Sequence, residues 1–257
     1  MRVIIRADAS PEIGGGHMMR CLALADALAR RGARCTFIAA WSLPGLETEI
    51  EARGHALRRI EPPGEPPSGR GWEGFQLGSG AQRRDAARTL EAIAMEVLDW
   101  VVIDHYWLGP AWESELRRRG ARVLAIDDLA DRGHDCDLLL DQTVGRSPGD
   151  YRSLVPATAS IFAGARFALL RPEFARDRPQ ALQRRRTRGP VRRLLLSLGL
   201  SDVGGDSERV LRAVLDLTPP CAIDVVLGAD APSRAAVEAL AGENPQGDIA
   251  CRQSTDG

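Results

Sequence analysis

The sequence has no lysine among its 257 residues, so its basic side chains other than histidine are all arginines. That absence excludes mechanisms that need a Schiff-base lysine or the phosphate-binding lysine of a P-loop. The formal net charge is −1, which gives no electrostatic case for a nucleic-acid partner or for a membrane surface.

Paired cysteines and long apolar runs are missing as well. The five cysteines are dispersed without a C-x-x-C pair, which indicates reduced, mostly buried thiols. No apolar run approaches the roughly 18 residues of a membrane span, and no signal peptide precedes the first apolar run. We therefore expect a cytoplasmic protein without a membrane span.

A glycine-rich turn near the start is the most informative stretch. The apolar run at residues 3–5 predicts a buried parallel strand, and apolar residues at helical spacing over 21–28 predict a helix. Open α/β sheets bind ligands at such turns, where the backbone amides of a glycine-rich loop can reach a ligand. The loop contains three consecutive glycines: Gly14, Gly15 and Gly16.

His17 follows this loop and falls in the first turn of the predicted helix, where the positive end of the helix dipole opposes protonation. We therefore expect a neutral imidazole that can act as a general base. Asp8 leaves the strand on the other side of the loop and would orient His17 through its second ring nitrogen. Arg20 shares the helix face of His17 and could hold an anion. The alternative is a structural turn with His17 on the surface.

The segment from Arg6 through Ile13 to Arg20 resembles the N-terminal signature of the UDP-2,4-diacetamido-2,4,6-trideoxy-β-L-altropyranose hydrolases of pseudaminic acid biosynthesis. The resemblance implies a GT-B-like fold and a hydrolysis at the anomeric carbon that releases UDP. It also implies a UDP-sugar substrate, no cofactor, no metal, and His17 as the base that activates water.

Asp104, His105 and Tyr106 end a second predicted strand, which begins at Trp100, and they also match a mark of that family. The resemblance implies that Asp104 and His105 bind sugar hydroxyl or N-acetyl groups and that Tyr106 covers the sugar. In the alternative interpretation, Asp104 caps the helix predicted over 110–119 and His105 only packs. An Asp–His metal pair would lack a third ligand at a recognisable spacing, so we expect no metal.

Two later segments resemble the family too, one over residues 126–137 and one over 164–174. For Asp127 and Asp128, which end a strand predicted over 122–126, a structural and a ligand-binding role both stay open. We expect His134 to belong to the loop scaffold. Phe167 stands where the family usually has tyrosine, which keeps the ring and removes a hydroxyl.

The arginine-rich residues 176–190 predict a solvated linker between a domain at 1–175, which carries the catalytic loop, and a partial nucleotide-binding domain at 191–257. The second domain repeats the order of strand, glycine turn and helix. By resemblance, Gly199 and Ser201 in that turn face the nucleotide phosphates, although Leu200 replaces a glycine of the family.

We therefore expect an α/β protein with two Rossmann-like domains in a GT-B arrangement, the second incomplete because the chain is truncated. The predicted function is hydrolysis of a UDP-linked 2,4-diacetamido-2,4,6-trideoxyhexose to the free sugar and UDP, by attack of water at the anomeric carbon. A GT-B glycosyltransferase and a non-catalytic nucleotide-sugar-binding remnant are the alternatives.

Overall fold

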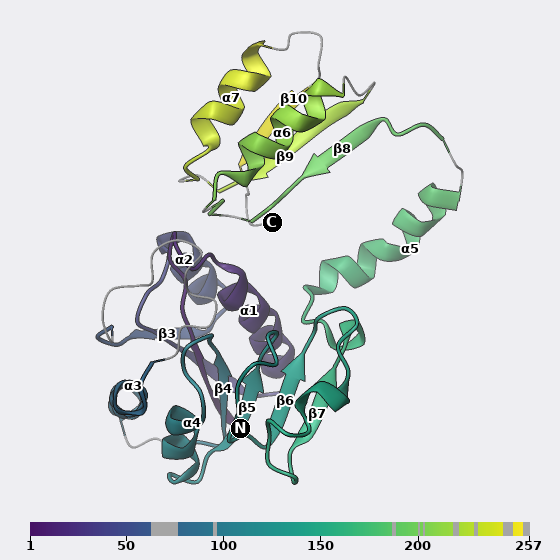
Figure 1. Cartoon of the computed structure of the whole chain (residues 1–257). Coiled ribbons are helices and arrows are strands. Elements are labelled where there is room, and N and C mark those ends of the chain that lie inside the picture. The colour runs from purple at the N-terminus through teal and green to yellow at the C-terminus, as the bar shows by residue number, and fades with distance from the viewer. Residues whose placement is uncertain are drawn as a thin grey trace. The chain divides into compact units, whose positions relative to one another are not determined.

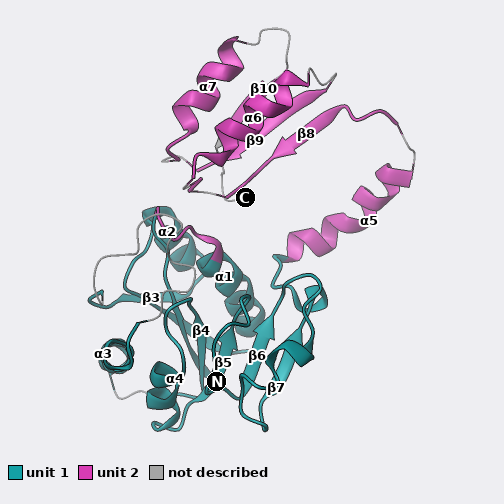
Figure 2. Ribbon diagram, in the orientation of Figure 1, with its two compact units in different colours: residues 1–10, 17–171 teal, residues 11–16, 172–257 magenta. Residues whose placement is uncertain are grey.

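The computed structural model divides the chain into two compact units, residues 1–10 with 17–171, and residues 11–16 with 172–257 (Figure 2). The domain boundaries near residues 175 and 190 that the sequence indicates stay a prediction. The structure describes the following residues: 1–62, 77–94, 97–186, 189–199, 201–202, 204–217, 221–228, 231–243 and 249–253.

A seven-stranded parallel sheet forms the first unit, with the strand order β3-β2-β1-β4-β5-β6-β7 (Figure 1). In such a sheet all strand carboxyl ends lie at one edge, where ligands bind in open α/β folds. The strands are β1 (Arg2–Ala7), β2 (Arg34–Ala39), β3 (Ala56–Arg59), β4 (Trp100–Asp104), β5 (Arg122–Ile126), β6 (Leu138–Asp141) and β7 (Ser160–Ala163).

Helices connect these strands, and they begin and end near the predicted residues. They are α1 (Gly16–Ala29), α2 (Pro44–Ala52), α3 (Ser79–Ala92) and α4 (Pro110–Arg117), with short 3₁₀ turns η2 (Pro148–Tyr151) and η3 (Ala165–Phe167) near the last two strands.

Apolar residues at helical spacing predict a helix over 82–97, and helix α3 departs from this span at both ends. It begins earlier because the Gln82 side chain donates a hydrogen bond to the Leu77 carbonyl, 2.8 Å away, which orders the chain before the first turn. It ends earlier because Ala94 adopts a left-handed conformation with φ 43°, which stops the helix. Residues 62–80 are rich in proline and glycine, which predicts a loop, and residues 63–76 of it lie outside the described residues.

Strand alternation decides which side chains meet each helix. On β1, Val3, Ile5 and Ala7 pack against α1 in one buried cluster, which also contains Val102 of β4. Arg6, between Ile5 and Ala7, therefore points to the other face, where it contacts α3. The two faces of the sheet thus receive different helices, α1 and α2 on one and α3 and α4 on the other (Figure 1).

The second unit contains a three-stranded parallel sheet with the order β10-β9-β8. Leu196, Val225 and Leu227 of this sheet pack with Leu211 and Val237 of two helices to form a separate core. The sequence predicts a strand from Leu194, helices over 207–217 and 232–241, and strands over 222–227 and 248–251, and the structure has each within about two residues of these bounds. These elements are β8 (Arg193–Leu196), α6 (Asp206–Asp216), β9 (Ala222–Leu227), α7 (Arg234–Glu243) and β10 (Ile249–Gln253).

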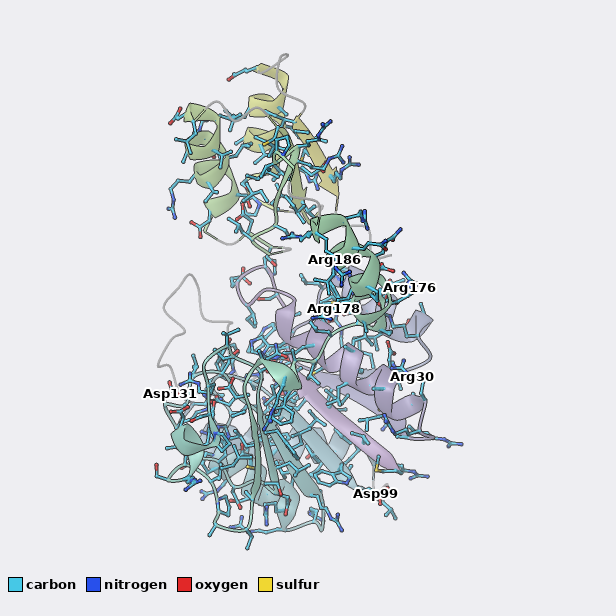
Figure 3. All side chains as sticks on the ribbon, turned by 90° about the vertical axis from the view of Figure 1, so that its right-hand side faces the viewer. Arg30, Asp99, Asp131, Arg176, Arg178 and Arg186 are labelled. Carbon is cyan, nitrogen blue, oxygen red and sulfur yellow. The ribbon has the colours of Figure 1, made fainter. Side chains whose placement is uncertain are left out.

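The arginine-rich segment forms helix α5 (Pro172–Arg186), from which Arg176, Arg178 and Arg186 project (Figure 3). The Arg176 side chain is 72% exposed and pairs with the neighbouring Asp177 carboxylate at 2.8 Å. None of the helices in the described ranges is long and apolar enough to cross a membrane.

Candidate active site

The imidazole of His17 and the carboxylate of Asp104 form a buried pair at the carboxyl edge of the large sheet. His17 is the second residue of α1, and Asp104 is the last residue of β4, in register with Ala7 of β1. Because Val102 faces α1, strand alternation turns Asp104 toward α1 as well. The distance from His17 Nδ1 to Asp104 Oδ1 is 2.5 Å, and the His17 side chain is 10% exposed.

Arg20 lies one turn after His17 and donates two hydrogen bonds to the same carboxylate, that of Asp104. Its Nε donates to Asp104 Oδ2 and its Nη2 to Asp104 Oδ1, both at 2.6 Å. Its Nη1 donates to Asp128 Oδ2 at 3.0 Å. The guanidinium of Arg20 is thus directed at two carboxylates of the protein itself, and the expectation that Arg20 also holds a ligand anion stays a prediction.

The charge of Asp104 fixes the tautomer of His17. Burial alone would raise the pKa of Asp104, but the facing His17 and Arg20 side chains hold that pKa well below its usual range. An ionised carboxylate can only accept, so the proton of the neutral His17 ring lies on Nδ1. Nε2 then carries the lone pair, which is the arrangement that a general base requires.

Tyr106 lies against the His17 ring. The two rings meet edge to face with centroids 4.6 Å apart, and the Tyr106 hydroxyl donates to Asp128 Oδ2 at 3.3 Å. Burial and the nearby Asp128 carboxylate raise the pKa of Tyr106, so its hydroxyl stays protonated at neutral pH. Tyr106 thus restricts the His17 ring from a side that Asp104 does not contact.

Asp8 does not orient His17, which corrects the sequence-based prediction. Asp8 is two residues after Arg6 and shares its face of the sheet, the face of α3. There its Oδ1 accepts from Arg6 Nη1 at 2.5 Å, and its Oδ2 lies 2.9 Å from Nε2 of His105. Arg6 also donates to both carboxylate oxygens of Asp85 on α3, at 3.1 and 2.9 Å.

This second cluster, Arg6, Asp8, Asp85 and His105, is buried. The side chain of His105 is 2% exposed, so the predicted role of His105 in binding sugar is wrong for this conformation. Burial lowers the pKa of His105, and the Asp8 carboxylate opposes this only in part. Asp8 also accepts from the backbone N–H of Ala40 at 2.8 Å, so the cluster braces the segment after β2.

Asp127 and Asp128 take different roles, which settles the two open interpretations in part. Asp127 accepts from the backbone N–H of Ala130 and from the Tyr151 hydroxyl, both at 2.8 Å, and pairs with Arg132 at 2.8 Å. It is therefore a structural residue of the loop after β5. Asp128 instead accepts a hydrogen bond from Arg20 and so belongs to the cluster around His17.

His134 belongs to the loop scaffold, as predicted. Its Nδ1 lies 2.8 Å from Glu113 Oε1, and its Nε2 lies 3.8 Å from Asp127 Oδ1. Burial lowers the pKa of His134, but the Asp127 and Glu113 carboxylates outweigh burial and raise it to about 9. His134 is therefore a cationic link between α4 and the loop after β5 at neutral pH.

The glycine loop before His17 is grouped with the second unit in the division of the chain. Gly14 has φ +81°, a backbone conformation that residues other than glycine rarely adopt. A Cβ on Gly14 or Gly16 would meet no atom within 4 Å, so backbone conformation rather than crowding explains Gly14. The role of Gly14, Gly15 and Gly16 toward a ligand stays a prediction.

The glycine turn of the second unit is held by Asp202. Its carboxylate accepts from the backbone N–H of Ser207 at 3.1 Å and from the Ser233 hydroxyl, so it joins the amino ends of α6 and α7. Gly199 has φ +122°, and the Ser201 hydroxyl is buried without a hydrogen-bond partner among the described residues. Leu200, which replaces a glycine of the family, lies outside those residues.

Sequence reasoning missed Asp104 as the partner of His17 and did not assign Arg6 and Asp85 to any site. Two signals were available for them. Alternation on β4 separates Asp104 from His105, and Asp85 lies on the same face of α3 as the buried Gln82 and Thr89, three residues before it and four after it. Across the part of the chain that the structure describes, no three His, Cys, Asp or Glu side chains are grouped to hold a metal ion.

Comparisons with known proteins agree with this fold. No protein-family model matches the sequence. The UDP-2,4-diacetamido-2,4,6-trideoxy-beta-L-altropyranose hydrolase of Campylobacter jejuni is 26% identical over 178 residues, which are 69% of this chain and 54% of that protein. The chain therefore spans about half the length of this curated relative.

Solved structures show the fold at low sequence identity. Arabidopsis thaliana UGT89C1 complexed with quercetin has a TM-score of 0.57 at 10% identity, with 99% of this chain and 69% of that chain covered. The S. aureus MnaA–UDP structure has a TM-score of 0.54 at 10% identity, with the same two shares covered. These likenesses and the two parallel sheets confirm the predicted α/β fold of the GT-B type.

Proposed function

We propose that the protein hydrolyses a UDP-linked 2,4-diacetamido-2,4,6-trideoxyhexose to the free sugar and UDP, with His17 as the general base. The observation that carries this proposal is the buried pair of His17 Nδ1 and Asp104 Oδ1, 2.5 Å apart, which leaves Nε2 as the basic atom. The name of the 26% identical relative and the signature around His17 support the substrate class.

In the proposed reaction, Nε2 of His17 takes a proton from a water molecule while the water oxygen attacks the anomeric carbon. The bond from that carbon to the diphosphate oxygen breaks, and UDP leaves with the bonding electron pair. Asp104 stabilises the imidazolium that forms. General-base assistance of this kind contributes roughly 10²–10⁴-fold in rate, and UDP needs little help from an acid because it is a good leaving group.

The two glycine turns are proposed to hold the diphosphate. Gly14 and Gly15 precede α1, which begins at Gly16, and Gly199 and Ser201 precede α6, so backbone N–H groups at helix amino ends are available for an anion. The buried hydroxyl of Ser201, which has no hydrogen-bond partner among the described residues, supports this assignment. Such preorganised donors stabilise the negative charge that develops on the leaving group.

Transfer of the sugar to an acceptor hydroxyl is the second candidate function. The likeness to UGT89C1 favours it on fold alone, and a base placed like His17 deprotonates an alcohol as readily as water. Product analysis with and without a sugar or lipid alcohol separates the two, since only a hydrolase releases the free sugar at full rate in water.

The test of hydrolysis is an incubation of the protein with the UDP-linked diacetamido-trideoxyhexose in ¹⁸O-water, followed by mass spectrometry of both products. We expect the label on the sugar and unlabelled UDP, because water attacks carbon. Label on UDP would mean attack at phosphorus and would contradict the mechanism. No release of UDP from several UDP-linked diacetamido sugars would contradict the function itself.

A further inference from the structure

One oxygen of Asp104 accepts from two side chains in the His17 site. Oδ1 accepts from His17 Nδ1 at 2.5 Å and from Arg20 Nη2 at 2.6 Å, while Oδ2 accepts from Arg20 Nε at 2.6 Å. Asp104 is fully buried, and the Arg20 side chain is 12% exposed, so water screens little of this interaction. Arg20 therefore neutralises the carboxylate that also bonds the imidazole.

This neutralisation matters because a lone buried carboxylate would hold the imidazole in its protonated form. An opposite charge within about 4–6 Å moves an ionisable group by roughly 1–3 pH units toward its charged form. A protonated His17 has no lone pair and is no base. A bidentate guanidinium on Asp104 offsets most of the negative charge that would keep the imidazole protonated, and it also holds the carboxylate in place.

We propose that Arg20 is a positioning residue that holds Asp104 against His17 Nδ1 and offsets the negative charge of that carboxylate. This inference rests on the proposed role of His17 as a base. Arg20 acts through Asp104 and needs no contact with the substrate.

The charged and titratable groups around His17 come from three elements. Asp104 at the end of β4 faces Nδ1, the Tyr106 ring packs edge to face, and Arg20 faces Asp104 from α1. Cys21 donates to Asp104 Oδ2 at 3.5 Å, and burial raises the pKa of its thiol, so it stays neutral. Asp128, after β5, accepts a hydrogen bond from Nη1 of the same guanidinium at 3.0 Å.

The sharing of Arg20 by Asp104 and Asp128 predicts opposite effects for two substitutions. Arg20→Gln removes the cation, so Asp104 acts on His17 with its full charge and His17 stays protonated to higher pH. Asp128→Asn removes the second carboxylate that pairs with Arg20, so the guanidinium offsets the charge of Asp104 more fully. His17 then loses its proton at lower pH. Arg20→Lys keeps the charge without the planar fork and should leave the midpoint near that of the parent.

A second imidazole–carboxylate–guanidinium triad in the chain provides a matched control. His55 Nε2 lies 2.9 Å from Asp26 Oδ1, and Arg53 Nη1 donates to Asp26 Oδ2 at 2.8 Å. The Asp26 and Arg53 side chains are 17% and 23% exposed, so solvent screens this triad more. Arg53→Gln is therefore the control for the loss of a guanidinium that does not contact Asp104.

The experiment is a pH titration of the four histidines in ¹⁵N-labelled protein by long-range ¹H–¹⁵N NMR, with His17→Asn used for assignment. We expect the His17 midpoint to rise by at least about one pH unit in Arg20→Gln, to fall in Asp128→Asn and to stay in place in Arg53→Gln. Unchanged signals of the other imidazoles report an intact fold. If Arg20→Gln does not fold, the His17 midpoint in Asp128→Asn still tests the inference, which predicts that this midpoint falls.

An unmoved His17 midpoint in folded Arg20→Gln, or shifts of the same sign in Arg20→Gln and Asp128→Asn, would overturn the inference. The titration needs no substrate, so it is independent of turnover. Loss of the proposed function would appear as no UDP release by the parent protein, whereas failure of this inference would leave that release intact.

Discussion

Asp104 and His105 are adjacent in the chain, but their side chains lie on opposite faces of the large sheet. Asp104 bonds His17 on the side of α1, whereas His105 bonds Asp8 on the side where Arg6 meets α3. Two polar clusters therefore flank the end of β4. The imidazole of the cluster on the α1 side, His17, is 10% exposed, whereas His105 of the other cluster is 2% exposed and braces the strand ends.

Substitution of Asp104 by asparagine should disable the base while it keeps the size of the side chain. The amide can donate to Nδ1, which favours the tautomer with the proton on Nε2 and removes the lone pair. We expect the turnover number to fall by roughly 10²–10⁴-fold, measured as UDP release at saturating substrate. Asp26→Asn, beside His55, is the matched control and should leave turnover unchanged. A loss of less than tenfold in Asp104→Asn would contradict this account.

Arg6 should matter for stability because it is fully buried between two carboxylates. Arg6→Met leaves Asp8 and Asp85 without their cation, and removal of one partner of a buried ion pair costs about 3–5 kcal/mol. Urea unfolding measures this free energy. In the control, Arg53→Met breaks a partly exposed pair with Asp26 and should cost about 1 kcal/mol or less. Equal losses in the two variants would contradict the structural role of Arg6.

His134 makes stability depend on pH at the alkaline side. Its pKa of about 9 in the folded protein lies above the value of about 6.5 for an unfolded chain. The folded state therefore binds the proton more tightly, which contributes about 3 kcal/mol below pH 6.5 and is lost as the pH rises through 9. We expect the difference in unfolding free energy between the parent and His134→Gln to shrink over this range. A difference that is constant with pH would contradict the raised pKa.

Gly14 and Gly16 should respond differently to alanine, although both have open space around the added Cβ. Gly14 has φ +81°, where an L side chain costs about 1–2 kcal/mol, whereas Gly16 begins α1, where alanine is favourable. Unfolding measurements should show a loss for Gly14→Ala and none for Gly16→Ala. Equal effects of the two changes would contradict the left-handed turn at Gly14.

The sequence is enough to predict most of the fold because apolar runs and helical spacing repeat along the chain. The strand predicted at 122–126 and the helix from Pro110 are found where the pattern puts them. Strand β7 was not predicted, since four residues at the sheet edge with only two buried or half-buried apolar side chains leave little pattern to detect.

The site was harder to predict than the fold. His17 and the glycine turn can be located from local residue types, but the partner of His17 depends on which face of β4 each side chain takes. Asp8 is near His17 in the sequence, whereas Asp104 is 87 residues away and in register with Ala7. Proximity along the chain therefore favoured the wrong carboxylate, and only the pairing of β1 with β4 identifies the right one.

The central claim is that His17 is the base, and the turnover of His17→Asn tests it most directly. Asparagine keeps a polar side chain of similar reach but has no basic atom. UDP release from the diacetamido-trideoxyhexose substrate at saturation would be compared for the parent, His17→Asn and the control His55→Asn, each checked for its fold by circular dichroism. We predict a fall of at least about 10²-fold in His17→Asn and parental turnover in the control. Turnover of folded His17→Asn within a few-fold of the parent would contradict the account.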